Sequence, residues 1–124
     1  MPHYYKTENR VQQECVIHFN NTYPKLRKLL FAVPNGGARS IREGLLLKQT
    51  GVTAGVSDLL LMVDGKTTCF ELKTEVGHQS KFQKEWQKLV EEHGFDYYII
   101  RSSEQFAEIL EYVINNKYHI NYKS

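Results

Sequence analysis

A two-residue turn, Asp64-Gly65, constrains this chain more than any other feature of its sequence. The turn separates two strand-like runs, LLLMV before it and KTTCFELK after it, and Asp-Gly between such runs is a strong signal for a tight β-hairpin. If Val63 and Lys66 flank the turn as a pair, the register of the whole hairpin follows. Counting outward residue by residue then brings Asp58 opposite Glu71.

The same register gathers ionisable side chains at one end of the hairpin. Directly paired residues lie on one face of a sheet, with Cβ atoms roughly 5 Å apart. Because side chains alternate along a strand, Lys73 shares the face of Glu71. Phe70 and Leu72 point to the other face. We therefore expect Asp58, Glu71 and Lys73 to converge on a surface that faces a ligand rather than in the core.

The rest of the chain predicts alternating helices and strands. The expected helices begin near Glu8, Ser40, Ser80 and Ser103, and the expected strands outside the hairpin cover 29–33 and 97–101. The third helix carries an apolar stripe formed by Phe82, Trp86, Leu89 and Val90. The resulting order, αβαββαβα, predicts an α/β fold with a mixed central sheet flanked by helices on both faces.

Composition fits a folded domain and gives little information about partners. Of 124 residues, 41% are hydrophobic and 24% are charged, so we expect one domain over 1–124, with 117–124 as a candidate flexible tail. The longest apolar run, 59–63, is far shorter than the roughly 20 residues that cross a bilayer. With no signal-like stretch at the start, we expect a cytoplasmic protein without a membrane partner.

A net charge of +2 permits a nucleic-acid partner without indicating one. Cys15 and Cys69 lack CxxC spacing and are expected to be reduced core thiols.

The cluster at the end of the hairpin has the chemistry that phosphodiester hydrolysis requires. Mg²⁺ prefers oxygen ligands, usually one or two carboxylates plus water, and Asp58 with Glu71 supplies such a pair. Lys73 could orient the attacking water or stabilise charge on the phosphoryl oxygens. The alternative is structural: Asp58 caps a turn, and Glu71 and Lys73 form a solvated hairpin face.

Longer segments carry a resemblance to a nuclease family. GVSD followed by ELK resembles the PD-(D/E)XK nuclease signature. The segments PNGGARS at 34–40, KQTGVTAGVSDLLL at 48–61 and FELKTEVGHQSKFQ at 70–83 resemble its VRR-NUC branch, the virus-type replication-repair nuclease domain of phage proteins and of a DNA-repair enzyme. The likeness covers about residues 8 to 110. It implies a restriction-endonuclease-like fold and a DNA endonuclease that depends on Mg²⁺ or Mn²⁺.

The resemblance also implies roles at matching positions. Asp58, Glu71 and the backbone carbonyl of Leu72 correspond to the metal ligands, and Lys73 corresponds to the catalytic lysine. These residues are all present, which favours an enzyme over a DNA-binding or assembly module that keeps the nuclease fold without turnover.

Alternatives stay open at other matching positions. Gln83 corresponds to the family's glutamine, but a capping box with Ser80 explains it equally well. Glu8 corresponds to the acid of the first helix, yet it could be only a favourable charge at a helix N-terminus, and Glu14 is close enough to be the acid instead. Ser57 stands where many relatives have Pro, which changes loop stiffness but keeps the adjacent carboxylate.

Nucleic acid is the partner that the resemblance implies. Asn35, Arg39 and Arg42 either bind backbone phosphate beside the metal or belong to a solvated loop and helix start. Stand-alone phage members of the family are dimeric enzymes that cut four-way (Holliday) junctions, and a two-fold dimer presents two equivalent sites. We therefore expect a homodimer that prefers branched DNA, with Tyr118 and Tyr122 of the tail as a candidate contact surface.

Overall fold

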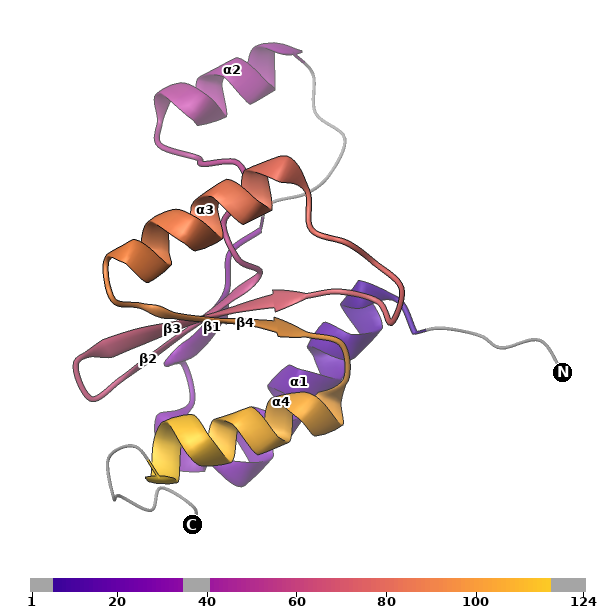
Figure 1. Ribbon diagram of the computed structural model, residues 1–124, viewed down its shortest axis with the longest axis vertical. Helices are drawn as coiled ribbons and strands as arrows, with labels where there is room; N and C mark the ends of the chain where they lie inside the picture. The colour runs from indigo at the N-terminus through magenta and orange to yellow at the C-terminus, as the bar shows by residue number, and fades with distance from the viewer. Residues whose placement is uncertain (1–5, 35–40, 117–124) are drawn as a thin grey trace, which may run out of the picture.

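A computed structural model of the protein describes residues 6–34 and 41–116. Within them, a four-stranded mixed sheet forms the centre (Figure 1). In spatial order its strands are β1 (Leu30–Ala32), β2 (Leu59–Val63), β3 (Lys66–Leu72) and β4 (Asp96–Ile100). The pairs β1–β2 and β2–β3 are antiparallel, whereas β3–β4 is parallel. The expectations that concern Asn35, Arg39, Ser40 and the tail at 117–124 lie outside the described residues.

Helices and strands follow one another along the chain in the predicted order. They are α1 (Glu8–Thr22), α2 (Ile41–Gln49), α3 (Lys81–Glu92) and α4 (Ser103–Leu110), with a 3-10 turn η1 (Pro24–Leu26) after α1 and a π-helical segment η2 (Glu111–Asn116) after α4. A parallel pair of strands cannot be joined by a tight turn, so the chain crosses from β3 to β4 through α3. The predicted fold class, a mixed α/β sheet flanked by helices, is confirmed.

The Asp-Gly turn forms the hairpin in the predicted register. Val63 pairs with Lys66, and the ladder continues to Leu59 opposite Phe70. Asp64 and Gly65 have φ values of 53° and 79°, and a tight hairpin turn of this kind needs positive φ at both central residues. Local turn chemistry therefore fixes the alignment of the two strands that carry the acids.

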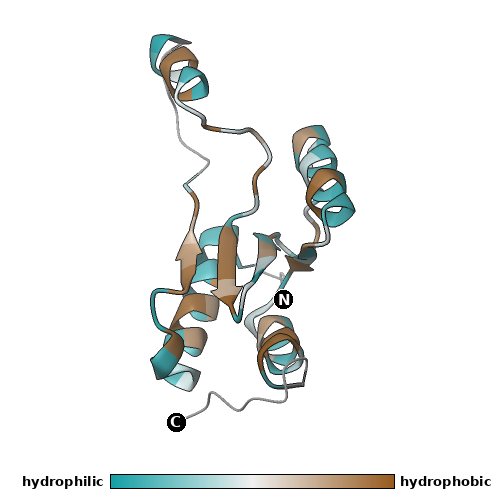
Figure 2. Ribbon diagram, turned by 90° about the vertical axis from the view of Figure 1, so that its left-hand side faces the viewer, coloured by the Kyte–Doolittle hydropathy of each residue, from teal (hydrophilic) through white to brown (hydrophobic). Residues whose placement is uncertain are grey.

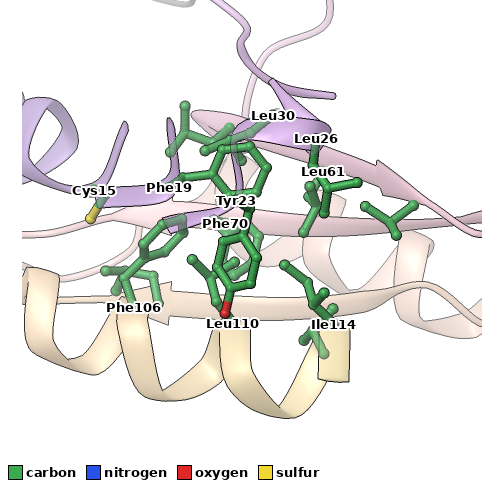
Figure 3. Packing of buried hydrophobic residues seen from close by; sticks show 14 of the residues in the cluster. Cys15, Phe19, Tyr23, Leu26, Leu30, Leu61, Phe70, Phe106, Leu110 and Ile114 are labelled. Carbon is green, nitrogen blue, oxygen red and sulfur yellow. The ribbon is translucent and has the colours of Figure 1, made fainter. Parts of the chain in front are cut away.

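The hydrophobic core lies between the sheet and the helices α1 and α4 (Figures 1 and 3). Phe70 of β3 packs its ring 4.9 Å from that of Phe106 of α4, edge to face, and 5.9 Å from that of Tyr98. Cys15 is fully buried here, and Cys69 is also a buried free thiol, as predicted. Since Phe70 faces this core, strand alternation directs Glu71 to the opposite face of the sheet.

Among the described elements, α3 alone covers that opposite face, while α2 stands away from the sheet (Figures 1 and 2). Trp86 of α3 packs on Tyr97 of β4, but Phe82 and Leu89 are 59% and 52% exposed. The apolar stripe predicted on α3 is therefore only partly buried, because no other described element packs over Phe82 and Leu89. On α2, Leu45 and Leu46 are exposed as well.

No helix in the described part of the chain combines the length and the apolar character needed to cross a lipid bilayer.

Candidate functional site

Asp58 and Glu71 meet at the end of the hairpin that lies away from its turn. The ladder pairs Leu59 with Phe70, so the two acids occupy the next position outward, as the register predicts. Oδ2 of Asp58 accepts a hydrogen bond of 2.7 Å from the backbone N–H of Leu72. The carbonyl of Asp58 also accepts one of 2.9 Å from the N–H of Val33. Asp58 is therefore fixed between the strands on either side of it.

The environment of Asp58 disfavours its negative charge. Burial raises the pKa of its carboxyl above the usual value, and the charges of Glu8 and Glu71 raise it further. The hydrogen bond from Leu72 and the charge of Lys73 act in the opposite direction without reversing the shift. A cation bound between the acids would relieve this repulsion.

Glu71 and Lys73 are buried, which corrects the expectation that both lie on an open ligand-facing surface. Glu71 is 0% exposed and Lys73 is 7% exposed. The reason is that Tyr97, from the neighbouring strand, and Gln79, from the loop before α3, lie against the Glu71 carboxylate. The Tyr97 hydroxyl and the Nε2 of Gln79, the latter at 3.2 Å, both donate to Oε1 of Glu71.

The second oxygen of Glu71 has a different environment. Oε2 is buried and has no hydrogen-bond partner among the described residues, while Nζ of Lys73 lies 3.7 Å away. A buried charged oxygen without a donor is costly unless a cation or another donor completes it. Within 6–34 and 41–116, no group of three or more His, Cys, Asp or Glu side chains could form a metal cage. Two carboxylates, a backbone carbonyl and water are instead the kind of donor set that Mg²⁺ takes.

The loop before Asp58 is packed against the start of α3. Gly55 has a φ of 85°, and a Cβ built there would lie 2.3 Å from the carbonyl oxygen of Phe82. Only glycine permits this approach. Ser57 follows, fully buried, and its hydroxyl donates to the carbonyl of Leu59 at 3.2 Å. The contact of Gly55 with α3 thus helps to set where Asp58 begins the strand.

The loop between β3 and α3 is held by Arg101, directly after β4. Its Nη1 donates hydrogen bonds of 2.8 Å to the carbonyls of Thr74 and Gly77. This loop carries Gln79, so Arg101 helps to place the amide that contacts Glu71. Sequence alone does not show this structural role of Arg101.

Sequence reasoning missed Tyr97 and Gln79, which both donate to the Glu71 carboxylate. Cys69 pairs with Tyr97 in the parallel ladder, so Tyr97 shares the face of Glu71. Strand alternation could have found Tyr97 if the parallel register had been known. Gln79 is a polar loop residue, and no periodic signal marks it.

Gln83 takes part in the start of helix α3. The carboxamide of Gln83 accepts from the backbone N–H of Ser80 at 2.8 Å, and Oγ of Ser80 accepts from the N–H of Gln83 at 3.2 Å, which is the capping box. This structural explanation of Gln83 is confirmed, and its catalytic role stays a prediction.

Arg42 is exposed in the first turn of α2, a helix that stands apart from the sheet, and its contact with DNA stays a prediction too (Figure 1).

The two candidate acids of the first helix differ in their surroundings. Glu14 is ion-paired with Lys6 at 2.9 Å and with Arg10 at 3.4 Å. The hydrogen bond from Lys6 lowers the pKa of Glu14, and Arg10 contributes in the same direction. Glu8 instead acts on the charge of Asp58. Glu8, unlike Glu14, therefore has an electrostatic effect on Asp58, and its role as the acid of the first helix stays a prediction.

Comparison with known proteins shows a likeness at the level of the fold. No protein-family model matches this chain, and no curated protein matches it either. Among solved structures, a protein described as a VRR_NUC domain protein superimposes with a TM-score of 0.75, covering 89% of each chain at 19% sequence identity. At this identity the likeness concerns the fold. The chain has the nuclease-like fold of a VRR_NUC domain protein, and the resemblance predicted from its sequence is confirmed at that level.

Proposed function

We propose that this protein is a divalent-metal-dependent DNA endonuclease that hydrolyses phosphodiester bonds. The observation that carries the proposal is the buried acid pair: Oε2 of Glu71 has no donor among the described residues, and it lies beside Asp58 and Lys73 on a nuclease-like fold. A buried carboxylate oxygen that lacks a donor calls for a structural or functional explanation, and a bound cation would complete it. The cell compartment that we propose is the cytoplasm, of the host if the gene is carried by a phage.

Each residue has a distinct proposed role. Asp58, Glu71 and the carbonyl of Leu72 would hold Mg²⁺ or Mn²⁺, which supplies a polarised phosphate and an activated water when bound. Lys73, whose Nζ lies 3.7 Å from Oε2 of Glu71, would stabilise the negative charge on the phosphoryl oxygens. Glu8 acts on the same centre through its charge.

A pair of variants separates metal binding from chemistry. Lys73→Met removes the ammonium and keeps most of the side-chain volume, so the folded variant should bind Mn²⁺ but lose nearly all DNA cleavage. Glu71→Gln should lose both. Lys84→Met, at an exposed position on α3, is the matched control and should keep both Mn²⁺ binding and DNA cleavage. Full cleavage by folded Lys73→Met would contradict the assignment.

We further propose that the protein acts as a homodimer on branched DNA. Hydrolysis at two symmetric positions of a four-way junction requires two sites, and a two-fold dimer supplies them. Exposed apolar side chains on α2 and α3 are compatible with a contact between copies; they are Leu45, Leu46, Phe82 and Leu89. Arg42, together with Asn35 and Arg39, is proposed to bind phosphate. Light scattering, combined with cleavage of matched linear, flap and four-way substrates, tests both parts; a monomer that cuts linear duplex as fast as junctions contradicts them.

The burial of Glu71 favours one other function, a DNA-binding module without turnover. A fully buried acid can serve as a structural charge paired with Lys73. The two functions differ in their response to metal. An enzyme gains cleavage on addition of Mg²⁺, whereas a silent module binds DNA equally well in EDTA and in Mg²⁺ and leaves it intact.

A further inference from the structure

The two carboxylate oxygens of Glu71 have unequal surroundings. Oε1 receives two donors, the hydroxyl of Tyr97 and the amide of Gln79 at 3.2 Å. Oε2 receives no hydrogen bond among the described residues and faces Lys73 at 3.7 Å. A carboxylate oxygen offers about two lone-pair positions. Both positions on Oε1 are therefore occupied, and Oε2 is the oxygen that remains for a cation.

The two donors are themselves held in place. The Nε2 of Gln79 also donates to Oε1 of Gln87 on α3 at 2.8 Å, so both of its N–H groups are used. The ring of Tyr97 packs 6.0 Å from that of Trp86, also on α3. Both donors to Glu71 are thus also in contact with the crossover helix α3.

This arrangement matters for the choice of cation. Mg²⁺ requires a small octahedral shell, with one oxygen from each carboxylate and several waters, whereas Ca²⁺ takes six to eight oxygens and readily binds both oxygens of one carboxylate. We propose that Tyr97 and Gln79 are specificity-determining positioning residues: by occupying Oε1 they confine Glu71 to one-oxygen coordination and so disfavour Ca²⁺ relative to Mg²⁺. The inference rests on the proposed function, since it assumes that Glu71 is a metal ligand.

The test measures cation affinity without DNA. Mg²⁺ and Ca²⁺ dissociation constants are determined by calorimetry at one pH and one ionic strength for the wild type, Tyr97→Phe, Gln79→Leu and the double variant. Freeing Oε1 should raise the affinity for Ca²⁺ relative to Mg²⁺ about tenfold in the double variant, with each single variant giving part of that change. A purely structural role would lower both affinities alike and leave their ratio unchanged.

Tyr98→Phe is the matched control. It makes the same change one residue along β4, on the side where Tyr98 stacks on Phe70, and it should leave the ratio of affinities at the wild-type value. Thermal unfolding without metal checks that each variant is folded. Should Tyr97→Phe be unstable, Gln79→Leu carries the test alone, because Gln79 lies in a loop.

The outcomes separate this inference from the function on which it rests. A wild type that binds Mg²⁺ and cuts DNA, with a ratio that stays within about twofold in the variants, overturns the selectivity inference and leaves the proposed function standing. A wild type that binds neither cation overturns both.

Discussion

Oδ2 of Asp58 accepts a 2.7 Å hydrogen bond from the backbone N–H of Leu72, which ties the acid before β2 to the strand that carries Glu71. Asparagine can accept the same hydrogen bond but is a much poorer metal ligand. We therefore expect Asp58→Asn to keep wild-type stability and lose metal binding. Asp58→Ala should lose metal binding and also about 1 to 3 kcal/mol of unfolding free energy, because the partly buried N–H of Leu72 loses its acceptor.

Urea denaturation and Mn²⁺ titration of the two variants check this prediction together. Equal stability of Asp58→Asn and Asp58→Ala would show that the hydrogen bond to Leu72 makes no net contribution to folding.

Gly55 gives a prediction about the loop that positions Asp58. Gly55→Ala should destabilise the protein by about 3 kcal/mol or more, since it combines positive φ with a clash against the carbonyl of Phe82. Gly94 is a matched control, because its φ of 86° is nearly the same but a Cβ there meets nothing within 4 Å. Gly94→Ala should cost only about 1 to 2 kcal/mol. Similar losses in the two variants, measured by denaturation, would contradict the close approach of Gly55 to α3.

Substitutions of Glu8 and of Glu14 should differ in their effect on metal binding. Glu8→Gln removes a charge that acts on Asp58, so it should weaken Mn²⁺ binding and slow cleavage. Glu14→Gln should leave both unchanged, because Glu14 is engaged with Lys6 and Arg10. Loss of metal binding in Glu14→Gln, with Glu8→Gln unaffected, would reverse the assignment.

Glu14 should instead affect the pH dependence of stability. Its pKa is lowered in the folded state, mainly by the hydrogen bond from Lys6. A lowered pKa stabilises the fold above the unfolded-state pKa, and this contribution is lost as the pH falls through the folded-state value. Glu14→Gln should therefore be less stable than wild type at neutral pH, and the difference should close in acid. Melting curves across that range test the sign; a difference that grows in acid contradicts it.

The thiols of Cys15 and Cys69 should be unreactive in the folded protein. Burial raises the pKa of Cys15 to about 12 and that of Cys69 to about 11, and neighbouring acids add to each shift. At pH 8 both thiols are then protonated as well as shielded, and only the thiolate reacts. An aromatic disulfide reagent should label neither cysteine in native buffer and both in denaturant. Rapid labelling of the native protein would contradict their burial.

The sequence predicts the hairpin well because its information is local. The Asp64-Gly65 turn specifies the pairing of its own neighbours, and the Ser80 capping box specifies where α3 begins. Counting from the turn was enough to bring Asp58 to Glu71. Alternation along one strand was likewise enough to separate Glu71 from Phe70.

The surroundings of Glu71 could not be predicted in the same way. Its burial depends on Tyr97, which reaches it only through the parallel register of β3 and β4. That register is set by how α3 packs after the crossover, and no turn specifies it. Helical periodicity also predicts that α3 has an apolar side without showing that Phe82 and Leu89 stay exposed.

The parallel pairing of β3 with β4 also has a consequence during synthesis on the ribosome. Asp58 and Glu71 leave the exit tunnel with their hairpin, but Tyr97 follows Glu71 by 26 residues, after the whole crossover helix. A nascent chain that ends before β4 therefore carries both acids without the tyrosine hydroxyl that donates to Glu71. The hydrogen-bonding surroundings of Glu71 are therefore completed only when β4 joins the sheet.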